Sequence, residues 1–260
     1  MITSLKNDKV RLVRALQRRR RVRQRERCFV IEGVRLGEEA TEAGVLPHFA
    51  FYTSEIQESL RVAALLKSWR EAGVPCIEVS RPVMEACSDT EAPQGLLAVV
   101  PIPDLPRPAR PTLTLILDRL RDPGNMGTIL RTALAAGVEQ ALIPPGTVDA
   151  TNPKVVRAGM GAHFRLPLVT MDWDRIPQAV AGCRVYLAAA RGTVPYTEVD
   201  WTESVALVVG GEAAGAGKRA HALADAEVTI PLAEGVESLN AAVAAAVILF
   251  EAVRQRRMAG

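Results

Sequence analysis

The sequence predicts an α/β protein of two domains, and three observations support this. At roughly 150 residues per domain, a chain of 260 residues is long enough for two. A proline-rich stretch at 101–111 is stiff and poor in backbone donors, as an extended interdomain linker is. On both sides of it, apolar runs alternate with helical patterns. We therefore expect domains over 1–100 and 112–260, joined by the linker 101–111.

The second domain is expected to contain a parallel sheet with helices on both faces. Its apolar runs are typical of strands that are buried on both sides, and they lie at 113–117, 140–144, 184–189, 205–210 and 228–232. Helical patterns separate or follow these runs at 126–136, 153–160, 174–181, 217–223 and 238–257. Ligands of such sheets bind beyond the carboxyl ends of the strands, so the ligand site is expected at the loops after 117, 210 and 232.

The first domain is expected to be a smaller α/β layer. Its predicted helices run over about 5–25, from Val34 onward and over 55–72, and its predicted strands lie at 28–33, 76–80 and 94–100.

Composition excludes several classes of protein. The four cysteines (28, 76, 87 and 183) form no C-x-x-C pair, which argues against a metal site or a disulfide scaffold and favours the reducing cytoplasm. The longest apolar run, 241–250, is far shorter than the roughly 20 residues that span a bilayer, so we expect no membrane partner. The amino terminus lacks the apolar core of a secretory signal. Aromatic residues make up only 4% of the chain, which argues against binding that depends on base stacking.

Positive charge is concentrated at the start of the chain. Residues 1–27 carry a net charge of +9, although the whole chain carries only +3. Such an arm is typical of a protein that binds a polyanion, and Arg18, Arg19, Arg20, Arg21 and Arg23 are its candidate RNA contacts. A solvated helix face and an arginine-rich transit peptide are the alternatives.

Three loops carry residues suited to chemistry, although each has an ordinary structural explanation. In the first, Pro123 and Gly124 predict a turn, Asn125 is the expected helix cap, and Arg131 follows within the helix. Taken alone, this pattern favours a capped amphipathic helix with an exposed arginine.

The second loop follows a strand that ends in Gly210 and Gly211, and Glu212 comes next. Glycines let backbone N–H groups approach a ligand closely. A P-loop would need glycine at 212, and a dinucleotide fingerprint would begin at the strand end rather than at Gly215, so neither motif fits well. A plain glycine-rich turn is the alternative.

In the third loop, Ser238 is the expected cap of a long alanine-rich helix, and Asn240 falls in its first turn. This slim helix could pack within the domain or against a second subunit.

Taken together, the three loops resemble a known family. The patterns N-x-G-x-x-x-R from Asn125, G-G-E-x-x-G from Gly210 and I-P-L-x-x-x-x-E-S-L-N from Ile230 are similar to the three signatures of SpoU-type RNA 2′-O-ribose methyltransferases of the SPOUT superfamily. The segment KVVRAGMGAHFRLPL at 154–168 is similar as well. FVIEGVRLGEEA at 29–40 resembles the amino-terminal RNA-binding domain of many members, which is similar to certain ribosomal proteins.

The resemblance implies a fold, a cofactor and a partner. The fold is a carboxy-terminal trefoil-knotted domain that binds S-adenosylmethionine and forms a homodimer across the knot. By motif position, Gly210, Gly211, Ile230 and Leu239 would contact the cofactor. The resemblance places the catalytic group around the ribose: Asn125, Arg131, Glu212, Ser238 and Asn240.

The expected reaction is methylation of a ribose 2′-hydroxyl in RNA, with ribosomal RNA of the 23S type as the favoured substrate. Because a guanidinium does not readily lose its proton, Arg131 is better suited to grip a phosphate and stabilise the developing alkoxide than to act as the base. Glu212 or water would then take the proton. Transfer RNA is the nearest alternative substrate. A non-catalytic ribosome-associated protein and a nucleotide-dependent oxidoreductase are alternatives of other classes.

Overall fold

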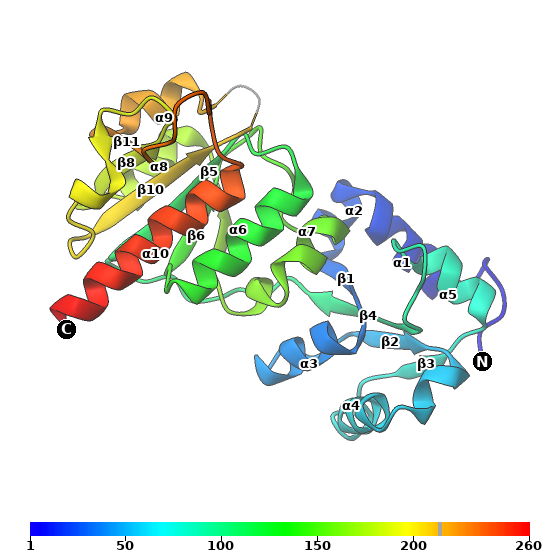
Figure 1. The fold of residues 1–260 in the computed structure, drawn as a ribbon. Helices are drawn as coiled ribbons and strands as arrows, with labels where there is room; N and C mark the ends of the chain where they lie inside the picture. Colours follow the sequence, from blue (N-terminus) through cyan, green and yellow to red (C-terminus); the bar gives the residue numbers. More distant parts are fainter. Residues whose placement is uncertain (213–214) are drawn as a thin grey trace. The chain divides into compact units, whose positions relative to one another are not determined.

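A computed structural model of the chain describes residues 1–212 and 215–260 and divides into two compact units (Figure 1). Unit 1 comprises Met1–Asp104 and Thr151–Phe164, and unit 2 comprises Leu105–Ala150 and Arg165–Gly260. The chain therefore passes between the units three times.

Unit 1 contains a four-stranded sheet in the order β1-β4-β2-β3. Its strands are β1 (Cys28–Glu32), β2 (Phe49–Tyr52), β3 (Cys76–Glu78) and β4 (Leu96–Pro101). β4 pairs antiparallel with β1 and β2, whereas β2 and β3 are parallel. The sequence predicted β1, β3 and β4, but it did not predict β2, which is only four residues long.

Five helices of unit 1 accompany this sheet, together with a 3₁₀ turn at Ser54–Glu58. They are α1 (Asp8–Arg18), α2 (Arg20–Glu26), α3 (Val34–Glu42), α4 (Leu60–Glu71) and α5 (Arg81–Cys87). The single helix predicted over 5–25 is therefore two helices. Arg19 separates them because its backbone is extended, with φ −124° and ψ 108°.

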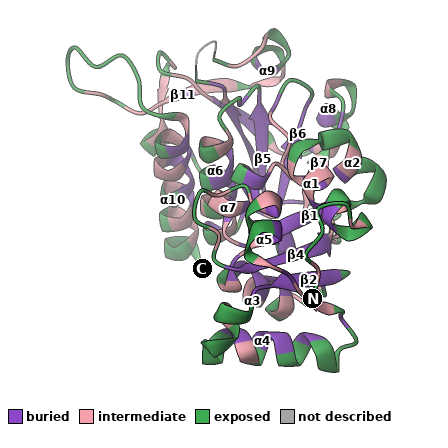
Figure 2. Cartoon of the chain, turned by 90° about the vertical axis from the view of Figure 1, so that its right-hand side faces the viewer, coloured by how far each residue is buried: buried purple, intermediate pink, exposed green. Residues whose placement is uncertain are grey.

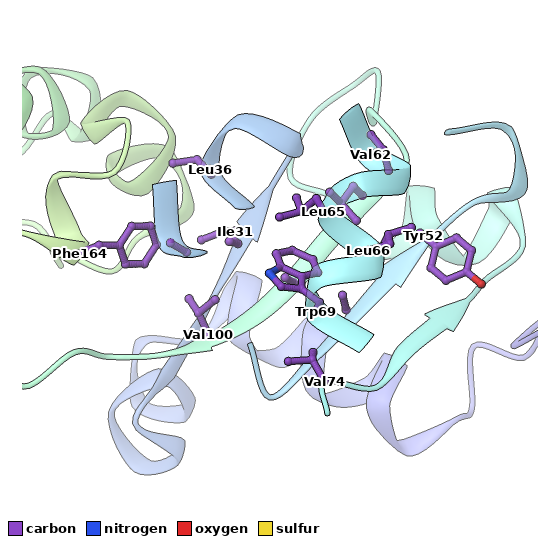
Figure 3. Close-up of a cluster of buried hydrophobic side chains, with 14 of the residues drawn as sticks. Ile31, Leu36, Tyr52, Val62, Leu65, Leu66, Trp69, Val74, Val100 and Phe164 are labelled. Carbon is purple, nitrogen blue, oxygen red and sulfur yellow. The ribbon is translucent and has the colours of Figure 1, made fainter. Parts of the chain in front are cut away.

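The second piece of unit 1 completes its hydrophobic core. This piece holds α7 (Pro153–Gly159) and a 3₁₀ turn at Ala162–Phe164, and it lies between strands of the other unit in sequence. Phe164 is buried in the cluster that also contains Trp69 and Ile31 (Figure 3). Its ring stacks on that of Phe29 with centroids 6.1 Å apart. Unit 1 is therefore built from two separate stretches of sequence.

Replacing Phe164 by alanine is expected to destabilise unit 1 by about 3–5 kcal/mol, because it leaves a cavity in a closely packed core. Urea unfolding followed by tryptophan fluorescence measures the loss, since Trp69 lies in the same cluster. Leu60→Ala is the matched control, because Leu60 is 88% exposed in the same unit, and its change should stay within about 0.5 kcal/mol. Equal effects of the two changes would contradict the assignment of Phe164 to this core.

Unit 2 is built on a seven-stranded sheet in the order β7-β6-β5-β10-β8-β11-β9. The strands are β5 (Leu113–Asp118), β6 (Gln140–Ile143), β7 (Leu168–Thr170), β8 (Arg184–Ala188), β9 (Val194–Pro195), β10 (Val205–Gly210) and β11 (Ala226–Thr229). Every strand pair is parallel, which confirms the predicted sheet type. β5 and β10 are neighbours in the middle of the sheet, and nearly all of their residues are buried. In Figure 2 the buried colour marks β5.

Helices cover both faces of this sheet, as predicted. α8 (Ile176–Ala179) and α9 (Lys218–Leu223) contribute to one apolar cluster with strand residues such as Ile116 and Val208. α6 (Pro123–Ala135) and α10 (Ala241–Ala259) run side by side over the other face (Figure 1). Within residues 1–212 and 215–260, every helix is too short or too polar to reach across a lipid bilayer.

The caps of α6 and α10 are not the residues that the sequence predicted. α6 begins at Pro123, because the side chain of Asp122 rather than that of Asn125 accepts the capping hydrogen bond, from the backbone N–H of Asn125. α10 begins at Ala241, because Asn240 rather than Ser238 is its cap. As a result, the side chains of Asn125 and Ser238 do not cap these helices, whereas Asn240 does. All three are residues of the candidate site.

Candidate active site

A cavity of about 540 Å³ opens at the carboxyl ends of β8, β10 and β11. Its wall combines the turn after β8, the end of β10 and the segment that joins β11 to α10. The predicted site residues in this wall are Gly210, Gly211, Glu212, Ile230, Ser238, Leu239 and Asn240. The loops singled out after 210 and 232 thus meet at one place.

Three polar side chains at the cavity form a hydrogen-bonded chain. Asn240 donates from Nδ2 to Asn125 Oδ1 at 3.0 Å, and Asn125 donates from Nδ2 to Glu212 Oε1 at 2.7 Å. The three residues are far apart in sequence, with 115 and 87 positions between the bonded pairs. Folding therefore brings a predicted residue of each loop into contact.

The direction of this chain is fixed by chemistry. Glu212 as a carboxylate can only accept, so it orients the Nδ2 of Asn125 toward itself and leaves Oδ1 for Asn240. Asn240 is oriented in turn because its Oδ1 accepts the backbone N–H groups of Ala242 and Val243 at 2.8 and 3.3 Å. The start of α10 thus determines which way both amides face, and Glu212 terminates the chain.

The two glycines at the end of β10 are required by packing within the protein. A Cβ on Gly210 would come within 2.5 Å of the backbone nitrogen of Ala216, and a Cβ on Gly211 within 2.2 Å of the carbonyl oxygen of Arg119. Both distances are too short for any side chain. Besides the close approach of a ligand that the sequence predicts, these glycines thus permit a close contact between backbone segments of the protein itself.

Arg131 does not belong to the described wall of the cavity. It lies six residues after Asn125 on α6, which places it about 9 Å further along the helix and about 120° around it. Thr128, Arg131 and Ala135 form an exposed stripe on this helix. Within one chain, Glu212, Ser238 and Asn240 line the cavity and Asn125 is hydrogen-bonded to two of them, whereas Arg131 is exposed and is not among the lining residues.

The predicted RNA contacts of unit 1 divide into two kinds. Arg18, Arg19, Arg20 and Arg21 are exposed where α1 gives way to α2. Arg23 is only 3% exposed, and its guanidinium donates to the carbonyl oxygen of Leu16 at 2.6 Å and to Thr151 Oγ1 at 3.2 Å. Arg23 is thus a core residue, which corrects its assignment to the surface arm.

Sequence reasoning missed two residues of this region. His221 is exposed, lines the cavity and shares a 2.7 Å hydrogen bond with Glu227. Asp118 drew no attention, although it is buried at the carboxyl end of β5. Its place in the motif-bearing loop after 117 was the available signal.

The cysteines are poor nucleophiles in this fold. Burial raises the pKa of the Cys28 thiol, with a smaller contribution from Glu26, and it raises the pKa of the Cys87 thiol as well, each to about 11. Both thiols are therefore protonated at neutral pH and cannot readily form a covalent intermediate.

The cavity suits a nucleoside-sized cofactor. Its volume lies within the range of about 300–1,000 Å³ that is typical of small-molecule sites. Aliphatic residues, including Leu187, Val209, Ile230 and Leu232, make up much of the wall. Glu212 is the one carboxylate among the described lining residues, so the site can favour a cation.

Known proteins resemble this chain over nearly its whole length. Residues 112–250 match the profile of the SpoU rRNA Methylase family, and residues 7–98 match that of the MRM3-like substrate binding domain. The 23S rRNA (guanosine(2553)-2′-O)-methyltransferase RlmP of Bacillus subtilis is 34% identical, over 96% of this chain and 97% of its own. The human mitochondrial rRNA methyltransferase 3 is 33% identical, over 94% of this chain and 72% of its own.

A solved structure agrees with these relatives. The SpoU methyltransferase AviRb from Streptomyces viridochromogenes, in complex with the cofactor AdoMet, superposes with a TM-score of 0.87 and 31% identity, covering 98% of this chain and 100% of its own. The chain belongs to the SpoU rRNA methylase family and is therefore an RNA methyltransferase.

Proposed function

We propose that this protein transfers a methyl group from S-adenosylmethionine to a ribose 2′-hydroxyl of large-subunit, 23S-type ribosomal RNA. The observation that carries the proposal is the chain from Asn240 through Asn125 to Glu212 at the edge of the cofactor-sized cavity. Relatives named for ribosomal RNA match over 94–96% of this chain, whereas a TrmH/SpoU tRNA modifying enzyme from A. aeolicus covers only 58% of it, with a TM-score of 0.52. The full-length likeness supports ribosomal over transfer RNA.

The reaction sets three demands on the site. The donor and the hydroxyl must be aligned, the hydroxyl proton must leave, and water must be kept out. S-adenosylmethionine supplies an electrophilic methyl group on a sulfonium when it is bound. Gly210, Gly211, Ile230 and Leu239 would hold it, since all four line the cavity.

The polar chain meets the demands on the hydroxyl. Glu212 can accept the hydrogen of a 2′-hydroxyl, and it or a water molecule then takes the proton. Asn125 and Asn240 each have a second N–H beyond the one used in the chain, and these donors can orient the ribose. Ser238 adds a hydroxyl to the same wall. Because the start of α10 fixes the two amides before substrate binds, little ordering remains for the moment of reaction.

Arg131 is assigned to the phosphate beside the target nucleotide and to the developing alkoxide. A guanidinium forms strong paired hydrogen bonds with phosphate and keeps its charge throughout. Since Arg131 is exposed and lies outside the cavity of its own chain, we assign it to the site of a second protomer.

A homodimer through α6 and α10 would make this possible. Val243 and Phe250 lie two turns apart on α10 and are 49% and 48% exposed, an unusual exposure for such residues at regular helical spacing. The exposed stripe of α6 that holds Arg131 belongs to the neighbouring helix. A second copy docked here covers the apolar residues and brings its own Arg131 close to the first protomer.

The family resemblance also leads us to propose a trefoil knot in unit 2 and a cytoplasmic location. Four cysteines without a disulfide support a reducing compartment. We propose that the amino-terminal domain, predicted over 1–100, docks RNA through Arg18–Arg21 and the shape of the duplex.

Mapping of 2′-O-methyl groups tests the proposal. In cells that lack the protein, we expect one modified ribose of the large-subunit RNA to become unmodified, and re-expression of the wild-type chain to restore it. Isothermal titration of the purified protein should show binding of S-adenosylmethionine and none of NAD. Loss of a ribose methyl group from transfer RNA instead would replace the proposed substrate, and unchanged modification of all RNA would refute the function.

A further inference from the structure

Two consecutive residues at the carboxyl end of β5, Asp118 and Arg119, hold both ends of the loop that carries Glu212. Asp118 is the last residue of β5, is 1% exposed, and lies opposite Gly210 of β10 in the sheet register. It therefore lies on the strand next to β10, whose carboxyl end lines the cavity. No step of the proposed chemistry uses this carboxylate.

The carboxylate of Asp118 holds the far end of the loop. Its Oδ2 accepts the backbone N–H of Gly217 at 2.6 Å, across 99 positions of sequence. Gly217 is also the residue from which α9 begins.

Arg119 holds the near end of the same loop. Its backbone adopts the left-handed region with φ +59°, which is costly for a residue other than glycine. Thr147 supports this conformation, because its Oγ1 accepts the N–H of Arg119 at 2.8 Å and donates to the carbonyl oxygen of Leu117 at 2.7 Å. The carbonyl oxygen of Arg119 consequently lies against Gly211, where no Cβ could fit.

Arg119 thus fixes the position of Gly211, and Asp118 fixes that of Gly217. Glu212 directly follows Gly211 in the chain. Gly211 also forms an isolated bridge with Gly215. The cavity is lined by Gly211, Glu212, Gly215 and Ala216, so the wall of the cofactor site depends on this attachment.

We propose that Asp118 is a positioning residue that clamps the loop carrying Glu212 to β5. It thereby positions the residues of this loop that line the cofactor cavity, and it keeps Glu212 within hydrogen-bond distance of Asn125. The inference rests on the proposed function, because it assigns the loop to the cofactor and to the ribose. It concerns the acceptor oxygen of Asp118 rather than its charge, since the partner is a neutral backbone N–H.

Three variants test the clamp by their affinity for S-adenosylmethionine and by kcat. Asp118→Ala removes the acceptor, and we expect the Kd for the cofactor to rise about tenfold or more, with a comparable fall in kcat. Asp118→Asn keeps an acceptor oxygen of the same shape, so both constants should stay within about threefold of wild type. Thr147→Val loosens the other end of the loop and should shift both constants in the same direction as Asp118→Ala.

Thr114→Val is the matched control for mere loss of stability. Thr114 lies on the same strand, is fully buried, and accepts a hydrogen bond from Gln140 Nε2 at 3.2 Å. Its replacement should lower Tm without changing the Kd for the cofactor. Hydrogen exchange in the peptides that cover the loop should rise in Asp118→Ala and stay at the wild-type level in Thr114→Val.

The outcomes separate the clamp from the function. If Asp118→Ala binds the cofactor as wild type does, or if Asp118→Asn is as impaired as Asp118→Ala, the positioning role is wrong. Should Asp118→Ala fail to fold, Thr147→Val and Asp118→Asn still decide the question. A wild-type protein that binds S-adenosylmethionine but methylates no RNA would refute the proposed function, while the comparison of Kd values would still test the clamp.

Discussion

Arg131→Ala is expected to lower kcat for methyl transfer by about 10²–10³-fold while the Kd for S-adenosylmethionine stays within about twofold. The physical reason is that the guanidinium is assigned to charge that develops on the ribose oxygen, and to the adjacent phosphate, but not to the cofactor. Its position outside the described cavity wall agrees with this division. Initial rates with an RNA substrate and calorimetric titration of the cofactor measure the two effects separately.

Arg131→Lys is the informative control for this change. Lysine keeps the positive charge but lacks the planar fork that binds two phosphate oxygens at once, so its rate should fall between those of alanine and wild type. A near-normal rate in Arg131→Ala, or a cofactor affinity that falls together with the rate, would contradict the assigned role.

A mixed dimer is expected to regain activity that neither parent dimer has. One protomer carries Arg131→Ala, and the other carries Asn240→Ser. The serine can still cap α10, but it lacks the amide that donates to Asn125. If Arg131 serves the partner's site, the mixed dimer contains one intact site, and its rate should reach about half that of wild type. Two different affinity tags allow its purification and assay.

The two possible arrangements of the site give opposite results in this experiment. If each protomer used its own Arg131, both sites of the mixed dimer would carry a defect, and the rate would remain at the level of the parent dimers. A mixture of separately purified parent dimers, assayed before they exchange subunits, provides the baseline. A protein that stays monomeric in sedimentation analysis would remove the basis of the proposal.

Local patterns in the sequence predicted the parallel sheet of unit 2 and five of its seven strands, but not the short strands β7 and β9. Strands such as β5 and β10 are apolar along their whole length, because helices cover both faces of the sheet, and this leaves a continuous signal. The helix starts were harder to place, since Asp122 and Asn125, or Ser238 and Asn240, are all good caps. Pro123 favoured the first of these, because proline is common at the first helical position.

The candidate site could not be assembled from local patterns at all. Asn125, Glu212 and Asn240 meet only after the strands have paired, and each residue alone fits a cap or a turn. The family resemblance placed them in one site. Asp118 was missed although it stands at the start of the loop after 117, because its partner is a backbone N–H 99 positions away and leaves no local pattern that points to this carboxylate.

The position of residues 151–164 was unpredictable for a related reason. The helix itself was expected over 153–160, and α7 is found at Pro153–Gly159. Amphipathic periodicity indicates that a helix has a buried face, but not which core it joins. Phe164 and Val156 belong to the cluster of unit 1, although the strands before and after them in sequence belong to unit 2.

This interleaving has a consequence for biosynthesis. As the chain leaves the ribosome, its first 104 residues emerge without the aromatic ring that stacks on Phe29. Roughly 60 further residues must be translated before Phe164 appears, which takes several seconds at about 5–20 residues per second. The amino-terminal part cannot reach its final form while it is the only part made. The nascent chain must therefore shield an unfinished apolar surface until the first strands of the catalytic sheet have also been synthesised.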